Sequence, residues 1–347
     1  MSKKTQKNQT ILITGGAGYI GTVLTPLLLK KGYKIKVLDR LFFGKKPIQD
    51  FFNNKNYELI KGDIRNTNKN LFKNVHAVIH LAALSNDPSC DIDSSLTQSI
   101  NYEGTIKIAK QAKQAGVKKF LFSSSCSVYG GGINVNLTEQ SSLNPVSLYA
   151  KLKAMAEKKI LQLADDNFAV IILRNPTVYG MSKRMRFDLV VNVMTLSAFE
   201  KRKIYLLGGG TQWRPLIHVH DLSRAFIQIL EAPLKKVQNQ IFNVGSNKEN
   251  YQMFQIAEIV KKIVPSVIEK IPSDQDKRTY NVSFDKINKI LNFKLEKTIS
   301  QAIKEIHEGL IKGLIYGDIK TKTVDYYKYL ITAEKLLKEI SLNGKIF

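Results

Sequence analysis

The sequence contains few cysteines, few acidic residues and no long apolar run. Only two cysteines, Cys90 and Cys126, occur in 347 residues, which excludes a disulfide-stapled scaffold and favours a reduced cytoplasm. No apolar stretch approaches the roughly 18–20 residues needed to cross a bilayer, so we expect no membrane partner. The basic start, MSKKTQKNQ, leads through a short apolar stretch into glycines, and we expect no secretory signal.

Acidic residues are scarce relative to basic ones, 29 against 53, which gives a net charge of +24. Such an excess can indicate nucleic-acid binding. The lysines are spread along the chain rather than clustered, which favours a solvated basic surface over a polyanion-binding patch. We therefore expect no nucleic-acid partner, although this surface would attract a doubly charged sugar nucleotide.

The first half of the chain alternates short β-rich runs with helical stretches. The runs end at Thr14, Asp39, Asp63 and near Ala83, and "VKKFLFSSS" and "FAVIILRN" follow later. Helical stretches cover residues of about 19–31, 94–115 and 147–164. Apolar runs separated by helices are typical of a buried parallel sheet, and right-handed crossovers then build a doubly wound α/β fold.

The alternation of strand-like and helix-like segments changes after Arg174. The length of the chain favours one large domain or two interleaved domains. Residues 181–215 are basic and mixed, whereas "LIHVHDLSRAFIQIL" and "QIFNVGS" indicate a return to the sheet, and 249–312 are typical of helices with short linkers. We predict a dinucleotide-binding domain over 10–180, to which 216–246 return. Residues 181–215 and 247–315 form the substrate domain, and 316–347 a basic, partly helical tail without assigned chemistry.

A glycine-rich stretch, "TGGAGYIG", lies between the first strand and the first helix. Gly15 would permit a tight turn, Gly18 would let backbone N–H groups approach a pyrophosphate, and Gly21 would let the helix pack on the strand. The helix N-terminus adds partial positive charge. Such a loop is a weak signal alone, but its position indicates a dinucleotide site.

Two carboxylates follow the next strands. Asp39 would accept hydrogen bonds from the adenosine ribose and repel a 2′-phosphate, which favours NAD over NADP, although the adjacent Arg40 would suit that phosphate. Asp63 in "GDI" is placed to accept from the adenine amine while Ile64 packs on the ring. The alternative for Asp63 is a capping aspartate in a turn.

Tyr149 and Lys153 in "SLYAKLK" lie four residues apart and share one face of a predicted helix. A nearby ammonium favours the phenolate, so this tyrosine can act as a base closer to neutrality. The alternative is a solvated helix face. In "FLFSSSCSVYG" we choose Ser125 as the hydroxyl that holds the substrate oxygen. Ser123 and Ser124 stay open, because strand alternation turns at least one of them away.

These motifs, together with "HLAA", "NYEGT" and "LRNPTVYG", resemble the extended short-chain dehydrogenase/reductase family, and within it the NAD-dependent sugar-nucleotide epimerases and dehydratases. The similarity covers about residues 10–315. It implies a Rossmann sheet of about seven strands with a smaller, mixed α/β C-terminal substrate domain, NAD as the cofactor and a nucleotide-linked sugar as the substrate. It also implies a homodimer that pairs through the helices around 94–115 and 147–164.

The resemblance implies that Tyr149 takes the proton from the sugar 4′-hydroxyl while hydride passes from C4′ to NAD⁺. Ser125 would bind the same oxygen, and Lys153 would bind the nicotinamide ribose. Besides Tyr149 and Lys153, the implied cofactor residues are Gly15, Gly18, Tyr19, Ile20, Gly21, Asp39, Arg40, Asp63, Ile64, Leu81, Ala82, Ala83 and Asn101. The implied substrate residues are Ser125, Thr177, Arg184, Arg186, Asn192, Arg214 and Arg278. The alternative for the arginines is that they are only surface charges. For Arg214 we prefer the ligand role, because it fits the family's diphosphate-binding arginine.

Departures from the family pattern reduce the number of reactions that we expect this chain to catalyse. Family 4,6-dehydratases carry an Asp-Glu pair directly after the serine or threonine, and decarboxylases carry a glutamate at the second of these positions. Cys126 and Ser127 stand there in this chain, which disfavours dehydration and decarboxylation. We expect a 4-epimerase of surface polysaccharide synthesis. The alternative is a 4-dehydrogenase similar to those acting on GDP-heptose, and both UDP- and GDP-sugars stay open.

"HVHD" at His218 to Asp221 raises the question of a metal. Alternating histidines on a strand point to opposite faces, so His218 and His220 would not share a site. The resemblance makes Asp221 a helix N-cap. We expect no metal.

Overall fold

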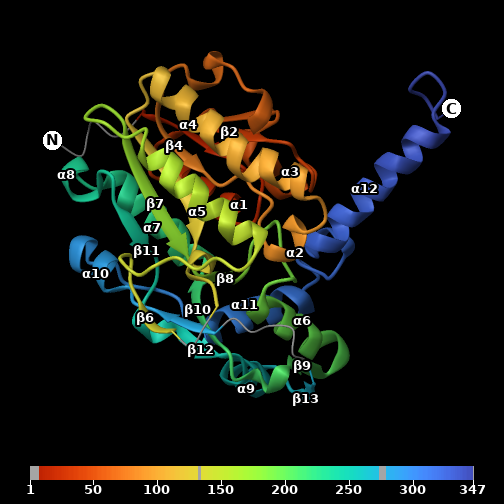
Figure 1. The fold of residues 1–347 in the computed structure, drawn as a ribbon. Coiled ribbons are helices and arrows are strands. Elements are labelled where there is room, and N and C mark those ends of the chain that lie inside the picture. Colours follow the sequence, from red (N-terminus) through yellow and green to blue (C-terminus); the bar gives the residue numbers. More distant parts are fainter. Residues whose placement is uncertain (1–7, 132–133, 273–278, 347) are drawn as a thin grey trace.

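A seven-stranded parallel sheet forms the centre of the molecule. The structure is a computed structural model that describes residues 8–131, 134–272 and 279–346. The strand order is β11-β7-β5-β4-β1-β2-β3, and every neighbouring pair is parallel (Figure 1). The strands are β1 (Thr10–Thr14), β2 (Lys34–Asp39), β3 (Tyr57–Lys61), β4 (Val75–His80), β5 (Lys119–Ser125), β7 (Ala169–Asn175) and β11 (Ile241–Asn243). The order reverses between β1 and β4, so the predicted doubly wound Rossmann sheet is confirmed.

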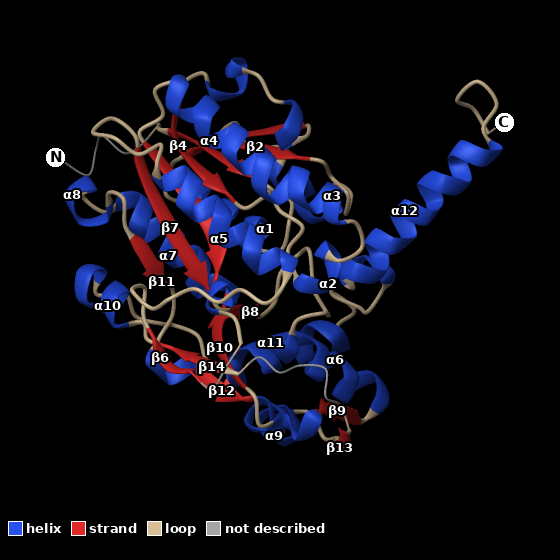
Figure 2. Cartoon of the chain, viewed as in Figure 1, coloured by secondary structure: helices blue, strands red, loops and turns tan. Residues whose placement is uncertain are grey.

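Helices cover both faces of this sheet, which is why its strands are continuous apolar runs (Figure 2). On one face α1 (Gly21–Lys30) and α7 (Val219–Glu231) pack against side chains such as Ile11 and Ile13. On the other face α4 (Thr105–Gln114) and α5 (Leu148–Leu161) pack against side chains such as Leu12. Because the helices pack on the two faces, they leave the carboxyl ends of the strands open to a ligand.

The helix predicted over 94–115 is interrupted. It consists of α3 (Ser94–Gln98), a π-helical turn η4 (Ser99–Gly104) and α4. Inside this turn the buried Asn101 accepts a hydrogen bond from the Leu84 amide and donates one to the Leu84 carbonyl. The extra residue of a π turn re-aims one side chain, and such turns occur mostly at functional sites.

The second domain is built from small sheets and helices. Strands β8 (Thr177–Tyr179), β10 (Trp213–His218) and β12 (Asn250–Gln252) form one sheet. Strand β9 (Lys203–Leu207) pairs with β13 (Val267–Ile271), and β6 (Asn134–Leu137) pairs with β14 (Tyr280–Val282). Helices α6 (Val190–Lys201), α9 (Met253–Ile263) and α11 (Ile299–Ile311) share a core with β8, β9 and β10.

The division between the domains differs from the prediction in two ways. Of the segment 216–246, α7 and β11 return to the main sheet, but β10 joins the small sheet because β8, directly after β7, offers it a parallel neighbour. Residues 249–312 also contain the strands β12, β13 and β14 beside their helices. Since β6 lies within the predicted first domain and pairs with β14, the two domains interleave.

The tail forms η8 (Ile319–Thr321) and a long helix, α12 (Thr323–Ile340). Figure 1 shows that α12 begins beside α2 and projects away from the body. Among the described residues, no helix has both the length and the apolarity that a bilayer crossing requires. The short elements are α2 (Asp87–Cys90), α8 (Leu234–Val237), α10 (Asp285–Leu291), η1 (Lys46–Phe51), η2 (Ile64–Asn66), η3 (Lys69–Phe72), η5 (Cys126–Tyr129), η6 (Gly208–Gly210) and η7 (Asn247–Glu249).

Candidate active site

A cavity of about 680 Å³ lies at the carboxyl edge of the main sheet. Residues at or just beyond the ends of β1, β2, β4 and β5 line it, and the second domain contributes a wall that includes Arg214 and Tyr280. This is where open α/β sheets bind ligands, because the crossovers diverge there. Nearly all of the predicted site residues lie around this one cavity.

The glycine turn is compact enough that side chains would not fit. Gly15 has φ +74°, and a Cβ there would lie 2.8 Å from the backbone of Ala82. A Cβ on Gly21 would lie 2.4 Å from the Gly16 carbonyl oxygen. Helix α1 starts without a side-chain cap, and Gly18, Tyr19 and Ile20 line the cavity. The turn therefore forms a bare backbone cradle at a helix N-terminus, which fits a dinucleotide pyrophosphate.

Asp39 also lines the cavity, at the end of β2. Its Oδ2 accepts from the Ala17 amide at 3.0 Å and its Oδ1 from the Leu41 amide at 2.7 Å. Burial raises its pKa, and these hydrogen bonds and Arg184 oppose the shift. Each oxygen keeps a second lone pair for a ribose hydroxyl. The carboxylate thus fits NAD as predicted.

Arg40 lines the cavity and is paired with Asp63. Its guanidinium pairs with the Asp63 carboxylate at 2.6 Å. Asp63 also caps η2 by accepting from the Arg65 amide at 2.8 Å, so the capping interpretation is confirmed. Burial alone would raise the pKa of Asp63, but hydrogen bonds from Arg65 and Arg40 hold it below its usual range. Asp63 and the buried Ile64 line the cavity, so adenine binding stays a prediction.

The three predicted catalytic residues line the same cavity. Ser125 ends β5, whereas Tyr149 and Lys153 lie on α5, and the Ser125 side chain acts to lower the pKa of the Tyr149 phenol. The other two serines are occupied elsewhere. The Ser124 hydroxyl donates to Glu157, and the Ser123 hydroxyl accepts from Asn175. Ser125 stays the predicted substrate-binding hydroxyl, since its side chain acts on the pKa of the Tyr149 phenol.

Burial acts on both Tyr149 and Lys153. Burial raises the pKa of Tyr149, and Arg186 and Ser125 act against that rise. The Lys153 ammonium donates to the Ser123 carbonyl at 2.7 Å and lies 5.8 Å from the centre of the Tyr149 ring. Burial also lowers the pKa of Lys153 to about 8. That Lys153 favours the Tyr149 phenolate stays a prediction.

Two predicted binding residues lie behind the cavity wall rather than in it. Asn101 is 1% exposed and bonds to both backbone groups of Leu84, beside the lining residues 81–85. Asn192 is fully buried; it donates to the Arg186 carbonyl and to the Tyr19 hydroxyl. Neither amide is among the residues that line the cavity; each bonds to a lining segment, and its binding role stays a prediction.

Among the predicted cofactor residues, Leu81, Ala82 and Ala83 line the cavity, as does the predicted substrate residue Thr177. Arg278 lies outside the described residues. Arg214 lines the second-domain wall, with its guanidinium carbon 5.8 Å from the centre of the Tyr280 ring.

Arg184 and Arg186 are not surface charges, since they are only 5% and 7% exposed. Arg186 forms a two-bond ion pair with Asp188, at 3.0 and 2.7 Å, and donates to the Ser85 hydroxyl at 3.1 Å. The guanidinium of Arg184 stacks on Phe43 at 3.6 Å. This places Arg184 beside the loop after β2, where its charge acts on the Asp39 carboxylate.

The sequence reasoning missed several lining residues. Asp188 follows Arg186 by two positions in "RMRFD", and that pairing of opposite charges is a signal that would have found it. Tyr327 comes from the tail, far along the chain, and no local motif marks it. The missed side chains include Phe42, Phe43, Ser85, Asp87, Asn175, Asp188, Tyr205, Gln212 and Tyr327.

Positions 126 and 127, where the family's 4,6-dehydratases carry an Asp-Glu pair, hold no carboxylate in this chain. Cys126 is fully buried, burial raises the pKa of its thiol, and its Sγ donates to the Arg174 carbonyl. It is therefore a poor nucleophile. Ser127 lines the cavity. Cys90 is also buried, and neither cysteine is in a disulfide.

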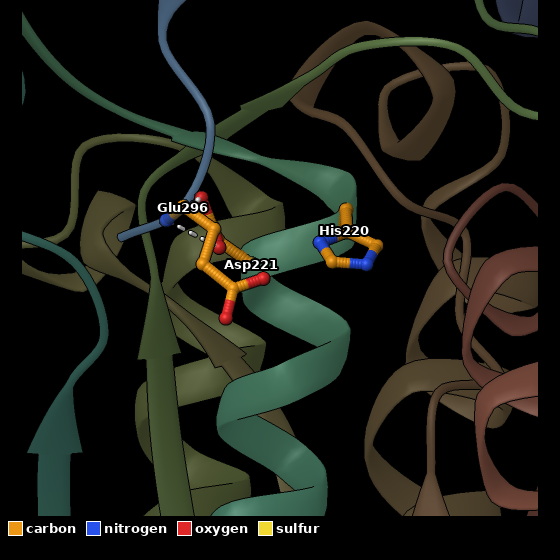
Figure 3. A group of neighbouring side chains, drawn as sticks. All are labelled: His220, Asp221 and Glu296. Atoms are coloured by element: carbon orange, nitrogen blue, oxygen red, sulfur yellow. Dashed lines mark hydrogen bonds between the residues drawn. The ribbon is translucent and has the colours of Figure 1, made fainter. Parts of the chain in front are cut away.

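His220, Asp221 and Glu296 form a separate cluster whose ligand atoms lie within 4.8 Å of one another (Figure 3). Two expectations about this region are wrong. The N-cap of α7 is His218, which accepts from the His220 amide, and His220 lies in the helix rather than on a strand. Asp221 instead accepts from the Glu296 amide at 3.0 Å.

The carboxylates of this cluster already have a cationic partner. Arg224 pairs with Asp221 at 2.8 Å and with Glu296 at 2.7 Å. A guanidinium between two carboxylates satisfies the charge that a metal would otherwise neutralise. The expectation of no metal stays a prediction.

Comparisons with known proteins agree with this geometry. Residues 11–245 match the NAD dependent epimerase/dehydratase family. The UDP-glucose 4-epimerase of Lactobacillus helveticus is 30% identical over 273 residues, 73% of this chain and 81% of that protein. The human dTDP-D-glucose 4,6-dehydratase is 28% identical over 268 residues, 75% of this chain and 74% of that protein.

Among solved structures, the UDP-glucuronic acid 4-epimerase of Bacillus cereus, in complex with UDP-glucuronic acid and NAD, is similar with a TM-score of 0.78. It is 25% identical and covers 88% of this chain and 100% of its own. With the glycine cradle, Asp39 and the Ser125–Tyr149–Lys153 set around one cavity, these matches show that the chain belongs to the NAD dependent epimerase/dehydratase family of enzymes.

Proposed function

We propose that the protein oxidises C4 of a nucleotide-linked sugar and that its net reaction is 4-epimerisation. The relatives include both 4-epimerases and 4,6-dehydratases, so the family leaves the reaction open. The observation that carries the proposal is that Ser125 and Tyr149 line one cavity beside positions 126 and 127, which lack a carboxylate. Dehydration needs acid–base groups at those positions, whereas chemistry at C4 alone does not.

In this mechanism Tyr149 is the base for the sugar 4′-hydroxyl. Its phenolate takes the hydroxyl proton, and Ser125 hydrogen bonds to the same oxygen and fixes its direction. NAD bound at the glycine turn would supply the hydride chemistry, removing hydride from C4 and, in an epimerase, giving it back to the opposite face of that carbon after the sugar has turned. Tyr149 then gives its proton back to the oxygen, so protons and electrons balance over the cycle.

Burial makes the Tyr149 phenolate a strong base, but it also lowers the fraction of Tyr149 that is ionised. Its pKa is raised by burial, so the phenolate forms only when positive charge is nearby. Arg186 supplies part of that charge, and Lys153, whose pKa is lowered to about 8, is still largely an ammonium at neutral pH. We infer that Lys153 also holds the nicotinamide ribose, which would bring its charge beside the reacting groups.

The second domain would hold the nucleotide. Arg214 lies on its wall beside Tyr280, and a guanidinium suits a diphosphate. The Bacillus cereus relative is complexed with a UDP-sugar, so we propose UDP-sugars as the first substrates to test and GDP-sugars as the second.

The test is an incubation of the purified enzyme with a panel of UDP-, GDP-, CDP- and dTDP-sugars. NMR and mass spectrometry distinguish an epimer, whose mass is unchanged, from a ketone that is two hydrogens lighter. We expect an epimer and no net NADH. A ketone accumulating with stoichiometric NADH would replace epimerisation with 4-dehydrogenation, and a dehydrated product would overturn the proposal.

A further inference from the structure

The tail, which carries no motif of known chemistry, is attached to the wall of the cofactor cavity. The Phe187 amide donates to the carbonyl of Thr321 at 2.8 Å. Thr323, at the first position of α12, is 1% exposed, and its hydroxyl accepts from the Arg184 guanidinium at 3.0 Å. The beginning of α12 is thereby fixed to the body, while its remainder projects outward (Figure 1).

The first turn of α12 packs on the loop that follows β2. The Tyr326 hydroxyl donates to the Phe42 carbonyl at 2.9 Å. The ring centres of Tyr326 and Tyr327 lie 5.4 and 5.8 Å from that of Phe43. Since Phe42 and Phe43 come shortly after Asp39 in the chain, the tail covers the loop beside the predicted ribose-binding carboxylate.

Tyr327 is directed into the cavity and lines it. Burial raises the pKa of its hydroxyl to about 12, Arg184 and Arg186 act to lower it, and Asp39 and Asp188 act to raise it. The hydroxyl therefore lies among the charged groups of the cofactor wall. An aromatic ring with a polar tip suits a nucleotide, which has both apolar faces and hydroxyl groups.

Arg184 has a donor that its surroundings do not use. It is 5% exposed and lines the cavity, and its Nε has no hydrogen-bond partner among the described residues. Its ring contact with Phe43 and its bond to Thr323 fix the guanidinium in place. A buried donor without an acceptor is costly, so this position favours an anionic ligand such as a phosphate.

We propose that the start of α12 belongs to the dinucleotide site: Tyr327 covers the ribose end of bound NAD, and Arg184 donates its Nε–H to a cofactor phosphate. The inference rests on the cofactor of the family and not on which sugar reaction follows. It assigns Arg184 to the cofactor rather than to the substrate. Release of NAD would then require the start of α12 to move, which slows exchange of the cofactor.

The test measures NAD release from the full-length protein. The enzyme is loaded with NAD and freed of excess, and bound NAD is then quantified over time after dilution into a scavenger of free NAD. We expect Tyr327→Leu to release NAD at least about tenfold faster than the wild type. The matched control is Tyr316→Leu, because Tyr316 is 55% exposed and does not line the cavity.

A second measurement needs no variant. Hydrogen exchange of the backbone amides is compared in the wild type with and without saturating NAD. We expect NAD to slow exchange at residues 319–330 as well as at the glycine turn. A folded Tyr327→Leu protein that keeps the wild-type release rate would overturn the proposal. Slowed exchange at the glycine turn with no change at 319–330 would do the same, including where Tyr327→Leu fails to fold.

Discussion

Single residues in this cavity are tuned by burial as much as by charge. Tyr149 and Lys153 lie on one helix, and burial shifts both of their pKa values toward the neutral form. A buried phenol and a buried ammonium each need a partner to become charged. We infer that the pair becomes active only as a set with Ser125 and the bound ligands.

Replacing Tyr149 by phenylalanine removes the base and leaves the ring. We expect Tyr149→Phe to lower turnover of the sugar nucleotide by about 10²–10⁴-fold, the usual contribution of a positioned base, with NAD still bound. Product formation is followed by NMR and bound NAD by extraction. The control is Tyr316→Phe, on the exposed part of the tail. Unchanged turnover in Tyr149→Phe would remove this residue from the mechanism.

Glu249 gives a prediction on stability. It is 6% exposed, burial raises its pKa to about 7, and it accepts from the Tyr179 hydroxyl at 3.0 Å. Because the folded state binds this proton more tightly, the contribution of Glu249 to stability is present below about pH 4.5 and is lost as pH rises through about 7. The loss amounts to about 3 kcal/mol.

The variant Glu249→Gln stays uncharged and lacks this loss. Urea unfolding at about pH 5 and about pH 8 should therefore show a larger fall in the free energy of unfolding for the wild type than for the variant. The matched control is Glu58→Gln, on a side chain that is 60% exposed. Equal pH dependence in wild type and Glu249→Gln would contradict the raised pKa.

At the scale of elements, the turn between β1 and α1 has no room for side chains, and we propose that its bare backbone holds the cofactor. A Cβ on Gly21 would meet the Gly16 carbonyl at 2.4 Å, and backbone cannot give way as a flexible side chain does. We expect Gly21→Ala to shift the start of α1 and to lower NAD affinity by at least about tenfold. Binding is measured by calorimetry.

Gly116 provides the control for this turn. Its φ is +77°, but no described atom lies within 4 Å of the point that a Cβ would occupy, and it follows α4 away from the cavity. Gly116→Ala should cost about 1 kcal/mol of stability through backbone strain and leave NAD affinity unchanged. An equal loss of NAD affinity in both variants would show that the effect is global destabilisation.

At the scale of the whole molecule, the remaining expectation is a homodimer. The helices predicted to pair across a two-fold axis are present, and Met155 on α5 is 50% exposed. We expect light scattering at micromolar concentration to give twice the 39.2 kDa chain mass and Met155→Lys to weaken the association. Lys335→Glu, on the far part of α12, serves as the control, and a monomeric wild type would refute the expectation.

Segments with a regular hydrophobic period, and turns marked by glycine, could be predicted from the sequence. The strands of the main sheet, the glycine turn, Asp39 and the face shared by Tyr149 and Lys153 depend on neighbours within a few residues. The π turn at Asn101 could not be predicted in this way, because its bonds are to Leu84 on another segment. The place of β10 likewise depends on β8, which lies far from it along the chain.

The amino-acid sequence alone determined the fold class and the cofactor and predicted a catalytic set, because each depends on local spacing and on the order of motifs along the chain. Tertiary structure alone decided which amides stay behind the cavity wall, how burial shifts the pKa values, and where the tail lies. Those properties arise from contacts such as that of Arg184 with Thr323, between segments 139 residues apart. Local patterns carry no information about such contacts, since packing brings the two residues together only in the folded chain.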